Sequence, residues 1–166
     1  MNNEKKAPVL TLEHLAPYLP YAFNVISKVT EYTYKVLGLS NDELMIAENA
    51  MFSGWYAISN FKPILRPISD LTKEIEHNEK KFVPIEWFEI GDDEAENWFT
   101  FDHGNINLIN DLSNISIHGI YHDINFLPYA VVQKLIKWHF DVFGLIEKGL
   151  AIDMNSIEGK ETKGNG

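Results

Sequence analysis

Residues 128–144 carry the most regular hydrophobic pattern of the chain, and this pattern constrains the fold more than any other feature. Pro128 stands at a position where a first helical turn tolerates proline, and Gly144 stands where a helix commonly ends. Polar side chains, among them Lys134 and Asp141, fall on one face. The side chains on the other face recur at steps of three and four residues: Val131, Val132, Leu135, Ile136, His139, Val142 and Phe143. The pattern predicts a long amphipathic C-terminal helix that forms a wall of the core.

Residues 22–60 show the period of β-strands instead. Aromatic and β-branched residues alternate with other positions over residues 32–36, and the Ser-Asn-Asp sequence at residues 40–42 is a turn signal. Residues 44–47 then return as a partner strand, and residues 55–58 supply another. The predicted fold class is therefore α+β: a small, mostly antiparallel sheet that packs against the long C-terminal helix and short helices.

Prolines punctuate the segments around these two patterns. Thr11 predicts the N-cap of a short helix that Pro17 and Pro20 stop. Because Pro63 and Pro67 cannot donate to a sheet ladder, residues 62–67 are predicted to form an extended edge or a crossover. The remaining predictions are a helix over residues 70–77, a strand over residues 98–101 and a short helix over residues 106–112.

The composition indicates one globular domain over residues 9–155, with polar tails at residues 1–8 and 156–166. The absence of cysteine removes disulfides and thiol nucleophiles and suits a reducing cytoplasm. The net charge of −10 opposes nucleic-acid binding and favours a protein partner, which includes a second copy of the chain. No apolar run reaches the roughly 20 residues that span a bilayer, so no membrane contact is predicted. No cofactor is predicted either.

Arg66 is the only arginine beside thirteen lysines, and it stands between two prolines. Its rigid fork can bind a carboxylate or phosphate in a bidentate manner that lysine cannot offer. One hypothesis is a structural ion pair with Asp70 or with the carboxylates of residues 86–96. The other is a grip on an anionic ligand or a partner carboxylate.

Four histidines are candidates for chemistry: His103, His118, His122 and His139. His118 and His122 have metal-ligand spacing on a helix, but their β-branched surroundings favour a strand, where they would lie about 13 Å apart. Metal binding is therefore not predicted. His139 is interpreted either as a core imidazole or as a general base whose pKa is tuned by burial.

Carboxylates gather between residues 86 and 96, and four of them are candidates for contact with a basic partner: Glu89, Asp92, Asp93 and Glu94. The run lacks the ligand pattern of a calcium loop. The chain also lacks a nucleophile elbow and both common phosphate-binding glycine loops. These motifs give little support to an enzyme, and no catalytic residue is predicted.

Three stretches carry a resemblance: Thr11–Tyr21, Lys62–Ile75 and Leu127–Asp153. Together they resemble a group of small uncharacterised proteins encoded by phages and prophages of Bacteroidetes-type bacteria. The resemblance implies a phage-encoded protein that acts in the cytoplasm of the bacterial host. Together with the small size, the acidity and the missing catalytic motifs, it favours an accessory protein that works by binding a host or phage macromolecule, as a host-takeover or anti-defence inhibitor. Two alternatives stay open: a small nucleotide- or anion-binding protein or enzyme that uses Arg66 and a histidine, and a component of virion assembly.

Overall fold

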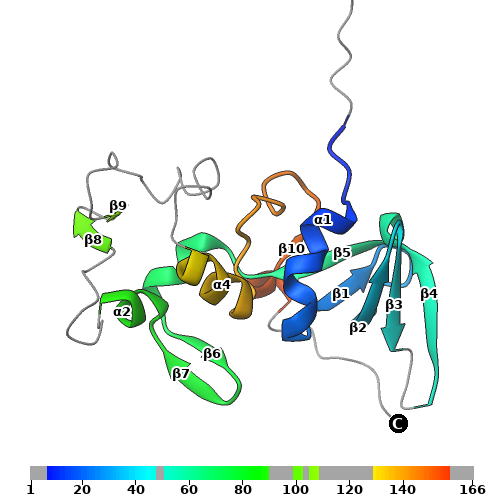
Figure 1. Ribbon diagram of the computed structural model, residues 1–166, viewed down its shortest axis with the longest axis horizontal. Coiled ribbons are helices and arrows are strands. Elements are labelled where there is room, and N and C mark those ends of the chain that lie inside the picture. The colour runs from blue at the N-terminus through cyan, green and yellow to red at the C-terminus, as the bar shows by residue number, and fades with distance from the viewer. Residues whose placement is uncertain (1–6, 48–50, 90–98, 103–104, 109–128, 158–166) are drawn as a thin grey trace, which may run out of the picture. The chain divides into compact units, whose positions relative to one another are not determined.

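The computed structural model describes residues 7–47, 51–89, 99–102, 105–108 and 129–157 (Figure 1). The chain divides into two compact units. Unit 1 comprises Met1–Arg66 and Gly144–Gly166, and unit 2 comprises Pro67–Phe143. Helices and a mixed sheet together confirm the α+β class. The prediction of a single domain over residues 9–155, with tails at residues 1–8 and 156–166, stays a prediction.

Six strands among the described residues of unit 1 form one sheet. They are β1 (Asn24–Ser27), β2 (Thr33–Ser40), β3 (Glu43–Ala47), β4 (Ser53–Ala57), β5 (Phe61–Leu65) and β10 (Ile152–Asp153). Their order in the sheet is β10-β5-β1-β2-β3-β4. All neighbours are antiparallel except β10 and β5, which are parallel, so the prediction of a mostly antiparallel sheet is confirmed.

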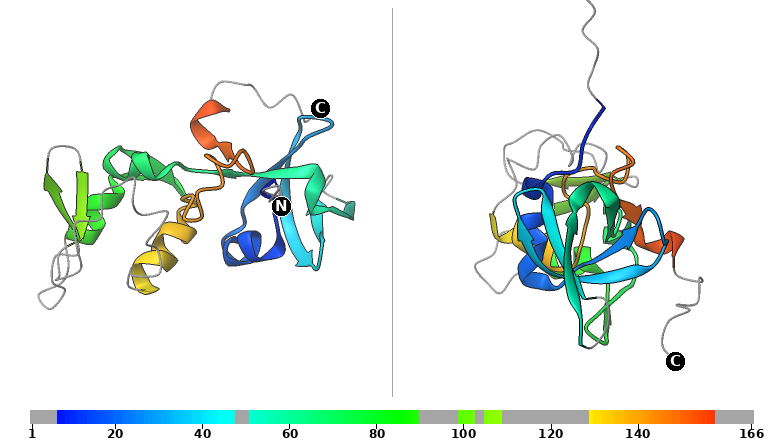
Figure 2. Two further views of the ribbon diagram at one scale, coloured as in Figure 1. Left: turned by 90° about the horizontal axis from the view of Figure 1, so that it is seen from above. Right: turned by 90° about the vertical axis from the view of Figure 1, so that its right-hand side faces the viewer.

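Strand β2 joins two parts of this sheet. Its first residues, Thr33–Lys35, pair with β1, and its remainder pairs with β3. The register shifts between Val36 and Gly38, which marks a β-bulge. A bulge bends a strand and increases its twist. The strands of unit 1 accordingly curve instead of lying flat (Figure 2).

The core of unit 1 lies on the face of the sheet to which alternate strand residues point. Val25, Leu44 and Ile46 are buried there, as the strand period requires. Two short helices, α1 (Leu12–Leu15) and the 3-10 helix η1 (Ala16–Tyr21), add the buried Leu15 and Tyr18. Burial of each such aliphatic side chain contributes on the order of 1.5–3 kcal/mol.

Both ends of α1 agree with the sequence, but the segment after it was not predicted. Thr11 is the N-cap, and its backbone N–H donates to Nδ1 of His14 over 3.2 Å. The α-helix ends at Leu15, before Pro17, as predicted, and the chain continues as η1, which contains both Pro17 and Pro20. Proline is compatible with this conformation, since its fixed φ lies in the helical range and only its own N–H bond is lost.

Pro63 lies within a strand that pairs on both sides, so the prediction of an edge for residues 62–67 is wrong. The register explains how the sheet accepts it. The N–H of Lys28 donates to the carbonyl of Asn60 over 2.9 Å, and hydrogen-bonded and non-hydrogen-bonded pairs alternate from there. Pro63 opposite Val25 is then a non-hydrogen-bonded pair, where no N–H points to β1. The pairing with β10 begins one residue later, at Ile64.

Unit 2 consists of short elements. They are the 3-10 helix η3 (Ile68–Thr72), β6 (Ile75–His77), β7 (Lys80–Phe82), α2 (Pro84–Glu89), β8 (Phe99–Asp102), β9 (Asn105–Leu108) and α4 (Tyr129–Lys137). Strands β6 and β7 form a hairpin, and β8 and β9 form another. The predicted strand at residues 98–101 is confirmed by β8.

Two helix predictions in unit 2 are wrong. Residues 70–77 form the end of η3 and then β6, although the predicted inward residues Ile68, Leu71 and Ile75 are all buried. Their spacing satisfies a strand and a 3-10 turn as well as it satisfies a helix. Residues 106–108 belong to β9, where a helix was predicted, and the remainder of residues 106–112 lies outside the described residues.

Helix α4 ends at Lys137, seven residues before Gly144, so the predicted length of this helix is wrong. The N–H of His139 donates to the carbonyl of Ile136, and the N–H of Phe140 donates to that of Leu135, each over 2.9 Å. These two bonds and the left-handed His139, with a φ of 62°, form a Schellman motif. The packing of this helix against the sheet stays a prediction.

Because the helix stops early, the face predicted for its last residues is also wrong. Asp141 was expected on the exposed face, yet it is completely buried. Trp138, Phe140 and Val142 are buried beside it in sequence. Beyond a helix end the period of 3.6 residues no longer decides which side chains face inward.

None of the helices in the described part of the chain combines the length and the apolar character that crossing a membrane requires.

Candidate functional site

The outer face of strands β2, β3 and β4 carries an apolar surface, which we call the Trp55 platform and define as Gly38, Met45 and Trp55. Gly38 and Met45 are half-buried, and Trp55 is exposed. Trp55 lies opposite Met45 in the β3–β4 register, and Met45 lies opposite Gly38 in the β2–β3 register. Opposite residues point to the same face of a sheet. Trp55 is 46% exposed, whereas Leu44 and Ile46 on the other face are buried. The platform therefore exposes the Trp55 indole of β4 on the outer face, while Leu44 and Ile46 of the neighbouring strand β3 point into the core on the other face.

Gly38 makes room for this arrangement. A Cβ added at Gly38 would lie 3.4 Å from Cε of Met45 and 3.5 Å from Cη2 of Trp55. The side chains of Met45 and Trp55 thus lie next to Gly38, in the space that a side chain at position 38 would occupy. The indole of Trp55 covers the backbone of Gly38. The platform is ordered by backbone pairing and by this contact, which keeps the loss of side-chain entropy on binding small.

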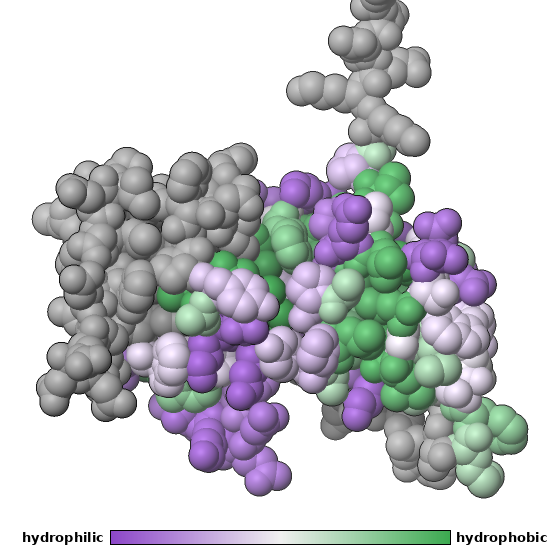
Figure 3. Space-filling view, viewed as in Figure 1, coloured by the Kyte–Doolittle hydropathy of each residue, from purple (hydrophilic) through white to green (hydrophobic). Residues whose placement is uncertain are grey.

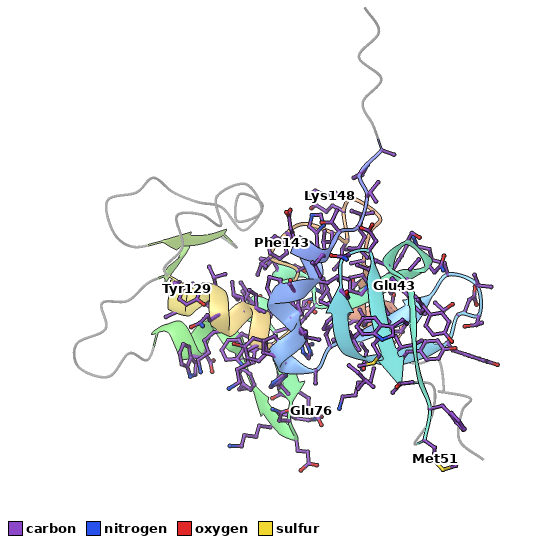
Figure 4. All side chains as sticks on the ribbon, turned by 45° about the vertical axis from the view of Figure 1, so that its right-hand side comes forward. Glu43, Met51, Glu76, Tyr129, Phe143 and Lys148 are labelled. Atoms are coloured by element: carbon purple, nitrogen blue, oxygen red, sulfur yellow. The ribbon has the colours of Figure 1, made fainter. Side chains whose placement is uncertain are left out.

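Further apolar side chains adjoin the platform in sequence. Leu37 is exposed at the β-bulge of β2. Met51 and Phe52 precede β4 and are 85% and 63% exposed. Figure 4 shows Met51 projecting at the start of β4, at the end of the β3–β4 pair opposite to Glu43. Figure 3 shows hydrophobic residues gathered on one face of unit 1, whereas the β6–β7 hairpin is mostly hydrophilic.

A second aromatic group in unit 1 surrounds the buried Phe61. The ring of Phe61 contacts Tyr34 and Tyr56 edge-on, with both centroid distances at 6.2 Å. The hydroxyl groups of Thr30 and Tyr34 are 3.4 Å apart. Edge-to-face pairs of this kind contribute about 0.5–1.5 kcal/mol beyond burial. These three rings therefore form a packing contact that joins β2, β4 and β5, and we assign no binding role to them.

Unit 2 holds a third aromatic group, formed by Phe82, Trp87 and Trp138. Trp138 is buried and lies 5.0 Å from Phe82 and 5.7 Å from Trp87, measured between ring centroids. Nζ of Lys134 stands 4.1 Å from the centroid of Trp87, which is cation–π geometry. Trp87 is the exposed member of the group, and Phe82 is half-buried. The ring of Trp87 therefore contacts both Trp138 and Lys134 within unit 2.

Arg66 follows β5 directly and is 6% exposed. A guanidinium buried to this degree cannot remain without compensation, and it is not offered to a ligand in bulk solvent. Its neighbours Ile64, Leu65 and Ile68 are buried too, as their apolar character predicts. Burial favours the structural hypothesis for Arg66 over the anion grip. The proposed ion pair with Asp70 stays a prediction.

His139 occupies the left-handed position of the Schellman motif that ends α4, and it is half-buried. Its ring meets that of His77 edge-on at a centroid distance of 5.7 Å. A structural role is enough to account for a histidine here, because position 139 has a positive φ and histidine tolerates that conformation better than most residues. His103, His118 and His122 lie outside the described residues. Within the described ranges, no three His, Asp or Glu side chains converge as metal ligands.

Of the four predicted acidic contact residues, only the backbone of Glu89 belongs to the part of the chain that the structure describes. Glu89 is the last residue of α2, and its side chain lies outside the description, as do Asp92, Asp93 and Glu94 entirely. Two carboxylates outside this acidic cluster are buried: Asp70 and Asp141. Nζ of Lys73 donates a hydrogen bond to Oδ1 of Asp70 over 2.6 Å and forms an ion pair with it, and the side chain of Lys73 is 62% exposed. Such a pair compensates the buried charge locally.

The Trp55 platform was not predicted as a site. The signal was present in the sequence, because Met51–Ile58 contains no charged residue and holds a tryptophan and a tyrosine. Without the register, however, nothing showed that Trp55 faces outward. No protein-family model, curated protein or solved structure matches the chain.

Proposed function

We propose that this protein works by binding a protein partner and that the Trp55 platform is the contact surface. The observation that carries the proposal is an ordered, 46% exposed tryptophan in the middle of strand β4, on the outer face of the sheet. Tryptophan is over-represented among the residues that dominate binding energy.

The nature of the partner follows from charge and context. A net charge of −10 favours a partner with a basic rim around an apolar centre. The resemblance of three stretches to phage-encoded proteins supports an accessory role in the cytoplasm of a bacterial host, as a host-takeover or anti-defence inhibitor. The alternative of an anion-binding protein or enzyme built on Arg66 is weakened by the burial of that side chain.

The test compares two tryptophans of matched exposure. Tagged full-length protein, Trp55→Ser and Trp87→Ser serve as baits in a bacterial lysate, and the captured protein is then purified and titrated against each. Trp55 and Trp87 are 46% and 47% exposed, so Trp87→Ser controls for the loss of an exposed indole. We expect Trp55→Ser to weaken binding by about 2 kcal/mol, roughly 30-fold, and Trp87→Ser by less than about threefold.

Equal affinity of the wild type and Trp55→Ser contradicts the proposal. Native mass spectrometry of the purified chain examines the main alternative. One stoichiometric nucleotide or other anion, together with no captured protein, would replace the binding function by the anion-binding alternative.

A further inference from the structure

Strand β4 is the outermost strand that the structure describes in its sheet, and its own residues include neither a charge nor a proline to protect the edge. Among the described residues, β4 pairs on one side only, with β3 (Figure 1). Protected edges have charges, prolines or very short strands. The opposite edge follows this rule, because β10 has two residues. Strand β4 has five residues, and the segment Met51–Ile58 contains neither proline nor charge in a chain with 23% charged residues.

The backbone groups that β4 directs outward can be identified from the register. The N–H of Ile58 donates to the carbonyl of Asp42 over 2.8 Å, so this is a hydrogen-bonded pair. Such pairs alternate with non-hydrogen-bonded ones along an antiparallel ladder. Tyr56 and Gly54 therefore bond to β3, and the N–H and C=O groups of Ser53, Trp55 and Ala57 point away from the sheet.

We propose that β4 pairs with β4 of a second copy of this chain, antiparallel and centred on Trp55. A two-fold axis at Trp55 places Trp55 opposite its own copy, Ser53 opposite Ala57, and Gly54 opposite Tyr56. The first two of these pairs use the outward-pointing groups and form hydrogen-bonded pairs. The contact is isologous and closes, so it gives a dimer and not a fibre.

The side chains favour a second copy over an unrelated extended peptide. The central pair is tryptophan on tryptophan, and aromatic cross-strand pairs are among the stabilising ones. Tyr56 of each copy lies opposite Gly54 of the other, and the missing side chain of Gly54 leaves room for the Tyr56 ring, which packs against Phe61 of its own copy. The edge itself is uncharged, and the net charge of −10 therefore does not repel the two copies at the point of contact.

The dimer would also join the two Trp55 platforms. Trp55 and its copy lie on the same outer face in this register, and Met45 and Gly38 continue the surface on each side. The inference goes beyond the proposed function, because it concerns the backbone edge and holds whether or not the platform binds another protein.

Proline at position 57 tests the edge without touching Trp55. Ala57 has a φ of −57°, which proline adopts without strain, and its N–H points away from β3. Ala57→Pro should therefore fold and melt like the wild type but dimerise at least about tenfold more weakly, since two interchain bonds are lost. Ala57→Ser keeps the N–H and is the control. Sedimentation velocity of the full chain over a concentration series measures both.

A cross-link provides an independent measurement. The chain has no cysteine, so Trp55→Cys creates a unique thiol. In the proposed register the two Cα atoms lie about 5.5 Å apart, within the disulfide range of about 4.4–6.8 Å. Mild oxidation should convert Trp55→Cys to a covalent dimer, whereas Val29→Cys, which is also exposed, should remain monomeric.

A concentration-dependent dimer that Ala57→Pro weakens and Ala57→Ser retains supports the inference, as does selective cross-linking at position 55. A monomeric wild type, equal association of wild type and Ala57→Pro, or equal cross-linking at positions 29 and 55 overturns it. If Ala57→Pro fails to fold, the cross-link decides. A dimer without a captured host protein would sustain this inference and refute the proposed function, and the reverse result would do the opposite.

Discussion

The two units build their cores in different ways. Unit 1 joins strands that are distant in sequence, and its core consists of the alternate residues of those strands, such as Val25, Leu44 and Ile46. Unit 2 consists of short elements and relies on large rings, with Trp138 between Phe82 and Trp87. Both units also bury other side chains, but Trp138 is a large ring that contacts two others, so its removal should have a larger effect than the removal of one aliphatic side chain from unit 1.

Unit 2 should show the larger response. Trp138 is 5% exposed, and Trp138→Ala removes an indole that contacts two other rings, so we expect a loss of about 3–5 kcal/mol in the free energy of unfolding. Trp87→Ala is the matched control, because that ring is half-exposed, and its removal should cost about 1 kcal/mol or less. Urea denaturation followed by circular dichroism measures both variants. Equal losses would show that unit 2 is not centred on Trp138.

In unit 1, Leu44→Ala should cost about 2–5 kcal/mol, with most of the lost protection confined to the amides of β1–β5. Leu44 is completely buried, whereas Leu37 on the neighbouring strand is exposed, so Leu37→Ala should cost less than about 0.5 kcal/mol. Hydrogen exchange with residue-level detection distinguishes the two units. A uniform loss of protection over both units would indicate that they unfold together.

The smallest effect concerns the end of α4. His139→Val should cost about 1–2 kcal/mol, because a β-branched residue resists the left-handed conformation, with its φ of 62°. His139→Gly satisfies that conformation and should stay within about 1 kcal/mol of the wild type, although it loses the ring contact with His77. Thermal unfolding of the pair measures the difference. If glycine proved as harmful as valine, the imidazole and not the backbone conformation would be the important property.

Much of the fold could be predicted because its signals are local. The turn at residues 40–42, the strands on either side of it and the start of the first helix at Thr11 all follow from residue type and period. The errors occur where two periods give the same inward residues. Ile68, Leu71 and Ile75 are buried as predicted, yet they belong to a 3-10 helix and a strand.

The candidate site illustrates the same limit. Arg66 was noticed because it is the only arginine, and its apolar neighbours correctly indicated a packed environment. Trp55 was assigned to a strand, but its outward orientation depends on the register with Met45 and on the bulge beside Gly38. A shift of one residue would have placed Trp55 in the core and Leu44 outside. Local sequence does not set that register.

The sequence by itself determined the α+β class, the strand-rich N-terminal half and the burial of the residues around Arg66, because propensity, turn chemistry and hydrophobicity act over a few residues. Only the tertiary structure decided that α4 stops at Lys137, that Asp141 is buried and that β4 lies at an edge with Trp55 exposed. These three features depend on which distant segments pair and pack together. Contacts between residues far apart in the chain cannot be predicted from any short segment, because they depend on which other segment packs against it.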